Sequence, residues 1–202
     1  GSVGFTGAPV LAAKAASMAG AGLVSLGVPE AIYRIAAVKC DEEMPFPLPC
    51  TAEGGLSGLA VYAILDKLKK ADACLLGPGL GQSQSVSEIV AAVLKNSRVP
   101  LILDADGINA VAGNIDILDE AACPVVMTPH AGEFRRLGGD LSDGSRLQAA
   151  RRFARAHGCI LVLKGHRTMT ALPDGTVYIN TTGGPAMAKG GTGDVLAGLT
   201  AA

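Results

Sequence analysis

One glycine-rich stretch of the sequence ends on a carboxylate, in the run Gly190-Gly191-Thr192-Gly193-Asp194. Glycines let the backbone approach a ligand closely, and the apolar residues that follow, Val195 and Leu196, predict a helix. The free N–H groups and the dipole at the start of such a helix form an anion site. Asp194 would lie in the first turn, where a carboxylate either stabilises the helix or acts as a general base that activates a hydroxyl beside a phosphate.

This stretch matches neither of two common nucleotide-binding motifs. The sequence has no G-x-x-x-x-G-K-[ST] run, so it contains no P-loop. It also has no G-x-G-x-x-G run that is followed by an acidic residue about 20 positions later, as a Rossmann dinucleotide site requires. A phosphate bound at this stretch would therefore be held by neither a P-loop nor a Rossmann glycine motif.

Two other polar clusters offer weaker signals. Gly79 and Gly81 either approach a ligand or make a tight turn between a strand and a helix. Asp104 and Asp106 point to opposite sides of an extended chain, so they make a poor metal pair. We expect one of the two aspartates to cap the next helix and the other to face the ligand.

Three further residues have both a structural and a functional interpretation. His130 and Glu133 stand three positions apart and could share a helix face, but a metal site needs more ligands; a carboxylate at position 133 also stabilises the first turn of a helix. Lys164 either buries its stem or contacts a nucleotide phosphate. The run Thr6-Gly7-Ala8-Pro9 predicts an N-cap followed by a proline in the first helical turn.

The elements that must position these residues alternate along the chain. Four short apolar runs are typical of strands buried on both faces of a parallel sheet: 73–77, 100–104, 125–128 and 159–164. Further strands are expected at 23–28, 168–172 and 177–180. Helices are expected at 8–19, 30–38, 57–70, 83–96 and 145–157, and the last has an amphipathic pattern.

This order predicts α/β layers joined by right-handed crossovers. The turn sequence Pro173-Asp174-Gly175 predicts a hairpin, so the late part of the sheet should be antiparallel. Residues 39–55, with three prolines, predict a loop or an excursion at the sheet edge. Because ligands bind beyond the carboxyl ends of parallel strands, the polar clusters should meet at one edge of the sheet.

The composition narrows the class of protein. Of 202 residues, 49% are hydrophobic and 17% charged, which excludes an intrinsically disordered chain. The net charge of −1 and the pI near 6.3 give no electrostatic reason to expect nucleic acid or an anionic membrane as a partner. Aromatic residues make up only 3%, so a base-stacking surface is not expected. The length suits one domain, 1–202.

The sequence contains neither a membrane span nor a signal peptide pattern, because it has no uninterrupted run of about 18 apolar residues and no basic segment before an apolar one. The five cysteines lie apart, with no C-x-x-C pair. We expect free thiols and a cytoplasmic location. Three cysteines in or beside apolar runs should act as small hydrophobes: Cys74, Cys123 and Cys159.

Taken together, the motifs resemble those of the ADP-dependent NAD(P)H-hydrate dehydratases, a branch of the ribokinase-like superfamily. The resemblance covers essentially the whole chain and rests on five runs: Gly4-Phe5-Thr6-Gly7-Ala8-Pro9, Gly77-Pro78-Gly79-Leu80-Gly81, Asp104-Ala105-Asp106 with Asn109, Thr128-Pro129-His130-Ala131-Gly132-Glu133, and Gly190-Gly191-Thr192-Gly193-Asp194. It implies a three-layer α/β/α fold with a mostly parallel central sheet. It also implies a central first strand and C-terminal helices that we expect to be missing from this chain.

The resemblance further implies a repair enzyme that restores NADH or NADPH from the S-configured hydrates NADHX and NADPHX, while ADP is converted to AMP and phosphate. Asp194 would lie at the reacting hydroxyl, and Ala8, Gly79 and His130 against the hydrate. The adenine nucleotide would be held by Lys164, Gly165, His166, Arg167, Thr168, Gly184, Gly190, Gly191, Thr192 and Gly193. Mg²⁺ would shield the ADP phosphates, without a metal site made by the protein alone.

Two other functions fit part of the pattern. A ribokinase-like kinase for a vitamin precursor or a sugar alcohol would use Gly193 and Asp194 equally well, but would leave His130 and Gly79 without a role. A non-catalytic nucleotide-binding module would bind without turnover. We also expect an NAD(P)HX epimerase as a fused domain or partner, and a homo-oligomer.

Overall fold

The computed structural model describes residues 1–142 and 144–202 and has the predicted α/β order. The strands are short: β1 (Ser25–Pro29), β2 (Met44–Leu48), β3 (Cys74–Leu76), β4 (Leu101–Leu103), β5 (Val125–Met127), β6 (Ile160–Leu163), β7 (Met169–Ala171) and β8 (Val177–Ile179). The α-helices are α1 (Gly7–Ala19), α2 (Glu30–Lys39), α3 (Ala60–Leu68), α4 (Gln84–Asn96), α5 (Asp106–Val111), α6 (Ala131–Arg136), α7 (Arg146–Ala156) and α8 (Thr192–Ala201). Two 3₁₀ turns, η1 (Ile115–Glu120) and η2 (Pro185–Met187), complete the order.

The strands pair as two sheets. The larger has the order β3-β4-β5-β6-β7-β8, in which β3 to β6 are parallel and β6, β7 and β8 are antiparallel. The smaller is the parallel pair β1-β2. The expected late antiparallel hairpin is therefore confirmed, and its turn carries Gly175 at a φ of +94°.

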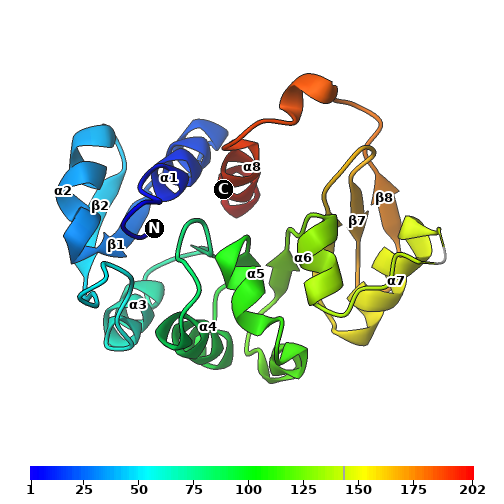
Figure 1. Ribbon diagram of the computed structural model, residues 1–202, viewed down its shortest axis with the longest axis horizontal. Coiled ribbons are helices and arrows are strands. Elements are labelled where there is room, and N and C mark those ends of the chain that lie inside the picture. Colours follow the sequence, from blue (N-terminus) through cyan, green and yellow to red (C-terminus); the bar gives the residue numbers. More distant parts are fainter. Residues whose placement is uncertain (143) are drawn as a thin grey trace.

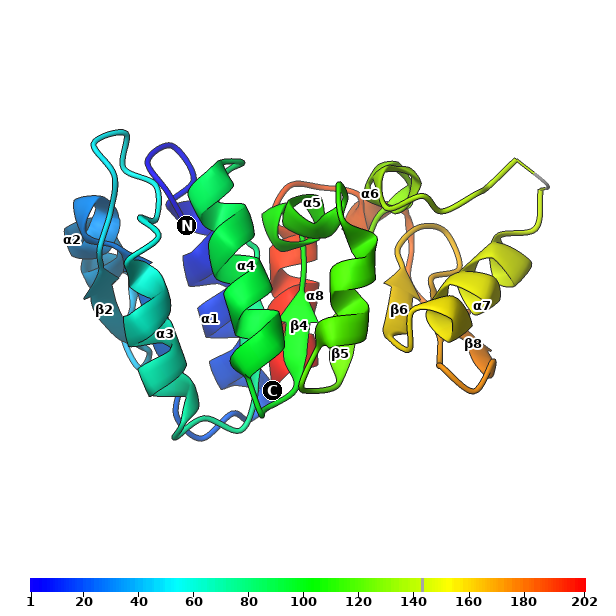
Figure 2. The ribbon, with the colours of Figure 1, turned by 90° about the horizontal axis from the view of Figure 1, so that it is seen from below.

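Helices cover both faces of the sheet, as Figures 1 and 2 show. α1 and α8 lie side by side on one face, while α3, α4 and α5 line the other. α7 covers the antiparallel end of the sheet, and α2 packs on the β1-β2 pair. This is the predicted three-layer α/β/α arrangement.

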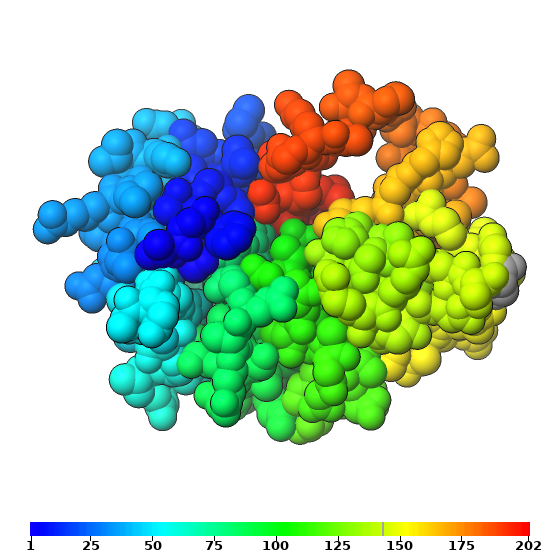
Figure 3. All heavy atoms as spheres, in the orientation of Figure 1, coloured from blue at the N-terminus to red at the C-terminus, as the bar shows by residue number. Residues whose placement is uncertain are grey.

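An exposed segment, residues 181–190, joins β8 to α8 and is called the strap below. It arches away from the sheet (Figure 1). In the space-filling view the molecule is open between the strap, the start of α8 and the turn that links β6 to β7 (Figure 3).

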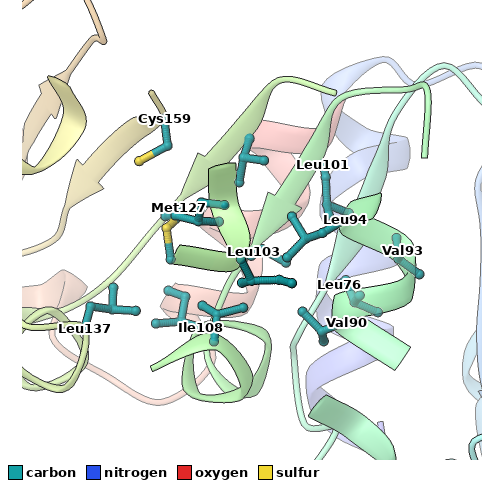
Figure 4. Close-up of a cluster of buried hydrophobic side chains, with 14 of the residues drawn as sticks. Leu76, Val90, Val93, Leu94, Leu101, Leu103, Ile108, Met127, Leu137 and Cys159 are labelled. Atoms are coloured by element: carbon teal, nitrogen blue, oxygen red, sulfur yellow. The ribbon is translucent and has the colours of Figure 1, made fainter. Parts of the chain in front are cut away.

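The core lies between the central strands and the helices α4, α5 and α7. Leu101, Leu103, Met127 and Leu161 are fully buried on the strands, and Figure 4 shows several of these side chains packed against Val90 and Leu94 of α4 and their neighbours. The continuous apolar runs that predicted buried parallel strands are thereby explained.

Two local predictions were wrong. Residues 39–55 contain the strand β2, which pairs in parallel with β1. The sequence did not predict this strand because it has prolines at alternate positions, Pro45 and Pro47. Proline has no N–H to donate to a neighbouring strand, so it is tolerated only where no hydrogen bond is needed. The second concerns only the cap bond: Thr6 stands at the predicted N-cap position of α1 and Pro9 lies in its first turn, but the Thr6 side chain makes no cap bond, because its backbone is already helical, with φ −74° and ψ −21°.

No helix among the described residues is long and apolar enough to cross a bilayer.

Candidate active site at the carboxyl edge of the sheet

The first turn of α8 is built by a glycine that reverses the chain. Gly191 stands at the start of α8 with φ +86°, a left-handed conformation that L side chains rarely adopt. A Cβ at this position would also lie 2.8 Å from Leu11 Cδ1 of α1. The turn places Asp194 in the first turn of α8, as the sequence predicted.

A buried ion pair lies beside this helix start. Lys164, directly after β6, donates to Asp104 Oδ1 at 2.8 Å. Asp104 follows β4 and is 1% exposed, and it also accepts a 2.6 Å hydrogen bond from the Thr128 hydroxyl after β5. Three neighbouring strand ends thus converge on one carboxylate. A Cβ at Gly193 would come within 3.6 Å of Lys164 Nζ, which brings the start of α8 to the same point.

Asp194 is half-buried near this pair. Burial raises the pKa of the Asp194 carboxyl, the negative charge of Asp104 raises it further, and Lys164 acts in the opposite direction. A carboxylate with a raised pKa is a stronger base than an ordinary aspartate, because its pKa lies nearer to neutral pH. The geometry therefore suits the general-base interpretation of Asp194.

The end of β5 supplies a capped helix. His130 is the N-cap of α6: its Nδ1 accepts from the backbone N–H groups of Gly132 and Glu133, at 2.9 and 3.2 Å. The Glu133 carboxylate accepts in return from the His130 N–H at 2.8 Å, which completes a capping box. Glu133 Oε2 also lies 3.9 Å from Lys164 Nζ. The first-turn interpretation of Glu133 is confirmed, while half of the His130 side chain stays exposed.

The loop after β3 meets the start of α1. A Cβ on Gly79 would lie 2.9 Å from Phe5 Cβ and 3.3 Å from Ala8 Cβ. Asp106 at the start of α5 accepts from the Gly81 N–H at 2.8 Å, so it holds the other end of this loop.

The expectation that one aspartate caps the next helix is wrong: Ala105 stands at the N-cap position of α5 without a side-chain cap bond, and Asp106, in the first turn, bonds the Gly81 loop instead. The Asp104 carboxylate lies at the carboxyl edge of the sheet, where it bonds Lys164 and Thr128.

Comparison with known proteins decides the family. A family model described as NAD(P)H-hydrate dehydratase matches residues 1–202. The chain belongs to the NAD(P)H-hydrate dehydratase family. Among curated relatives, the bifunctional NAD(P)H-hydrate repair enzymes Nnr of Moorella thermoacetica and Salinibacter ruber are 44% and 43% identical over 204 and 199 residues. These matches cover 100% and 96% of this chain but only 38% and 36% of the relatives.

Solved structures agree with the family and the fold. An ADP/ATP-dependent NAD(P)H-hydrate dehydratase from Bacillus subtilis, co-crystallised with ATP and Mg²⁺ and soaked with CoA, superposes with a TM-score of 0.78 at 34% identity. The match covers 98% of this chain and 69% of that one. A ribokinase-like superfamily protein from Enterococcus faecalis gives a TM-score of 0.80 at 30% identity, covering 98% and 66%. The ribokinase-like fold prediction is confirmed.

The residues that the family resemblance singled out fall into two groups. One group lies close together: a Cβ on Gly79 would meet Ala8, a Cβ on Gly193 would meet Lys164, and Asp194 lies near the Asp104–Lys164 pair. The other lies in the turn after β6 and in the strap and is largely exposed: Gly165, His166, Arg167, Thr168, Gly184 and Gly190. A Cβ added at Gly184 or Gly190 would meet no other atom within 4 Å, so packing within the protein does not require glycine at these positions.

Two parts of the edge were missed from the sequence. The pairing of Asp104 with Lys164 joins residues 60 positions apart, which no local pattern reveals. A cavity of about 270 Å³ next to the Gly81 loop is lined by Gln82, Ser83, Asp106 and Asn109 among others. Asn109 accepts from Arg136 Nε at 3.0 Å, so the cavity wall is fixed by α6. The polar residues that follow β4 were the only feature of the sequence that indicated this cavity.

Proposed function

We propose that the chain carries an ADP-dependent NAD(P)H-hydrate dehydratase activity, in which (6S)-NADHX or NADPHX is dehydrated to NADH or NADPH while ADP becomes AMP and phosphate. The observation that carries the proposal is Asp194, held in the first turn of α8 beside the buried Asp104–Lys164 pair, with a pKa raised by burial. Membership of the dehydratase family supports the substrate class.

Asp194 acts as the base in this proposal. Its carboxylate takes the proton of the hydrate hydroxyl as that oxygen forms a bond to the terminal phosphorus of ADP, and the bond from that phosphorus to AMP breaks. The N–H groups at the start of α8 stabilise the negative charge that develops on the transferred phosphoryl group. Loss of phosphate and one ring proton then restores the ring double bond.

The hydrate is assigned to the side of the site formed by Ala8, Gly79 and His130. Gly79 lies against Ala8, and the half-exposed His130 stands at the start of α6. The adenine nucleotide is assigned to the opening bordered by residues 164–168, the strap and the first residues of α8. The Bacillus subtilis dehydratase that was co-crystallised with ATP and Mg²⁺ supports a nucleotide in this fold.

Mg²⁺ would enter on the phosphates of the nucleotide. Among residues 1–142 and 144–202, no group of three or more His, Cys, Asp or Glu side chains could hold a metal ion. Mg²⁺ commonly needs only one or two carboxylates beside substrate phosphates, and Asp104 and Asp194 lie near the proposed phosphate position. When bound, the ion would neutralise phosphate charge.

The setting of the activity is part of the same proposal. The described cysteines are all free thiols, which suits a reducing cytoplasm. The chain spans 38% of the length of a bifunctional repair enzyme, so we propose that an NAD(P)HX epimerase acts with it as a fused domain or a partner. The homo-oligomer expected from the sequence also stays a proposal.

A direct assay tests the proposal. The full-length protein is incubated with the S-hydrate of NADH and with ADP and Mg²⁺, and dihydronicotinamide absorbance and AMP are followed together. The expected result is equal amounts of NADH and AMP, and no NADH without a nucleotide. ATP-dependent phosphorylation of a small alcohol with no loss of hydrate would instead identify a kinase, and nucleotide binding without either reaction would identify a non-catalytic module.

A further inference from the structure

Arg146 reaches from α7 into the turn that follows β6. It is the first residue of α7, and its guanidinium donates to three backbone carbonyls of one short segment. Nη1 bonds the His166 oxygen at 2.9 Å, while Nη2 bonds the Lys164 oxygen at 3.2 Å and the Leu163 oxygen at 3.4 Å. A single side chain thus binds three of four consecutive carbonyls around this turn.

The turn is shaped around this guanidinium. Gly165 has φ +149°, and a Cβ at that position would lie 2.9 Å from Arg146 Nη2. Arg167 also has a positive φ, +55°, a conformation that costs a non-glycine residue free energy and persists only where its surroundings hold it. Thr168 closes the turn by donating from its hydroxyl to the Gly165 oxygen at 3.0 Å.

We propose that Arg146 is a positioning residue for the adenine nucleotide, which rests on the proposed function of residues 164–168. Carbonyl oxygens that faced a phosphate would repel it. Because Arg146 binds three carbonyl oxygens of the turn from the α7 side, these oxygens are held away from the proposed phosphate position. The same bonds hold the backbone of the turn, while the Lys164 side chain is held separately by its own bond to Asp104. The positive charge of Arg146 adds attraction for an anionic ligand, since guanidinium groups stay charged in proteins.

Arg151 provides a matched control on the same helix. Its Nε donates to the Gly175 oxygen at 2.9 Å, so it also binds a turn carbonyl of the antiparallel strands. That turn joins β7 to β8 at the opposite edge of the sheet from Lys164. Loss of Arg151 should therefore weaken the fold near α7 without touching the nucleotide.

The test compares Arg146→Ala, Arg146→Lys and Arg151→Ala in the full-length protein. The Michaelis constants for ADP and for the hydrate are measured separately, and ADP binding is measured by calorimetry without hydrate. Arg146→Ala should raise the KM and Kd for ADP about tenfold or more, because the turn loses the three carbonyl bonds that hold it in shape. The KM for the hydrate and kcat should change less than about twofold, and lysine should restore only part of the ADP affinity because it lacks the planar fork.

The inference is overturned if Arg146→Ala weakens ADP binding no more than Arg151→Ala does, or if it lowers kcat and the affinities for both substrates together. If Arg146→Ala does not fold, Arg146→Lys decides instead: ADP affinity below that of Arg151→Ala is expected, and an affinity equal to that of Arg151→Ala contradicts the inference. A wild-type protein that binds ADP but leaves the hydrate intact would contradict the proposed function alone, since the calorimetric comparison still tests Arg146.

Discussion

Two side chains that form an ion pair with each other shift the pKa of Asp194 in opposite directions. The carboxylate of Asp104 raises its pKa, and the ammonium of Lys164 lowers it, on top of the larger effect of burial. The Asp104–Lys164 pair therefore sets the proton affinity of the proposed base as well as the position of Lys164.

The pH dependence of the reaction follows from this arrangement. Asp194 must be deprotonated to act as a base, so kcat/KM should fall as the pH drops through its pKa, at a pH above the ordinary aspartate value of about 3.9. Asp104→Asn removes the negative charge that raises the pKa of Asp194 and leaves the Lys164 ammonium without its nearest carboxylate, so both effects move the acid limb to lower pH. The measurement is a pH profile of kcat/KM for both proteins, and a limb that stays in place or moves upward would count against the assignment.

A second substitution at the same position, Asp104→Ala, tests the stability of the pair. Asp104 is almost fully buried, and its loss leaves the ammonium of Lys164 with the more distant Glu133 as partner. Removing one partner of a buried ion pair costs about 3 kcal/mol, so Asp104→Ala should lower the free energy of unfolding in urea by about that amount. Asp66→Ala, which breaks an exposed pair with Lys69, serves as the control and should leave stability nearly unchanged; equal losses would show that burial of the pair has no energetic consequence.

At the residue scale, the sequence predicted which side chains gather but not how they pair. Asp104 and Lys164 were each recognised as following a strand, because polar residues after apolar runs are visible in the sequence. Their ion pair depends on the adjacent positions of β4, β5 and β6 in the sheet and on the start of α8, which are set by tertiary packing.

At the scale of elements, His130 at the N-cap of α6 has a structural role and a proposed role in substrate binding. His130 caps the helix through its Nδ1 and is also assigned to the hydrate. His130→Ala should lower the free energy of unfolding by about 1 kcal/mol, as loss of an N-cap does, and should raise the KM for the hydrate. His130→Asn should recover the stability, since asparagine is a good N-cap, but not the KM. If asparagine recovers both, His130 is a cap and not a substrate contact.

The contact between α1 and α8 depends on a small residue. A Cβ on Gly198 would overlap the carbonyl oxygen of Ala12, and it would lie 2.9 Å from Ala15 Cβ. Gly198→Ala should therefore cost about 1–3 kcal/mol through overpacking and, because α8 carries Asp194, should also lower kcat. Gly113→Ala is the matched control, because its Cβ would meet nothing within 4 Å. Thermal unfolding of both variants checks this, and equal stability of the two would show that the helices can separate without cost.

The predicted helices and strands were nearly all confirmed, because periodicity and apolar runs are local properties. The strand β2 escaped because prolines at alternate positions oppose strand formation except where the N–H has no partner to meet. Thr6 stands at the predicted N-cap position but makes no side-chain cap bond, because its backbone is already helical, which the sequence does not reveal.

At the scale of the whole molecule, the sheet brings the chemistry together. The four parallel strands β3 to β6 place their carboxyl ends side by side, and α8 returns from the antiparallel end through the strap to bring Asp194 to the same edge (Figure 1). This closure was predicted from strand order and from the position of ligands in open α/β sheets. The strap's path was not, since glycine-rich segments have many allowed conformations.

The central claim is that Asp194 is the base of an ADP-dependent dehydration, and one comparison tests it most directly. In the full-length protein, kcat for the ADP-dependent recovery of NADH from its S-hydrate is measured for the wild type and for Asp194→Asn, with ADP affinity determined in parallel. The account predicts a kcat lowered by about 100-fold or more, the usual contribution of a general base, with ADP still bound. Normal turnover by Asp194→Asn would contradict it.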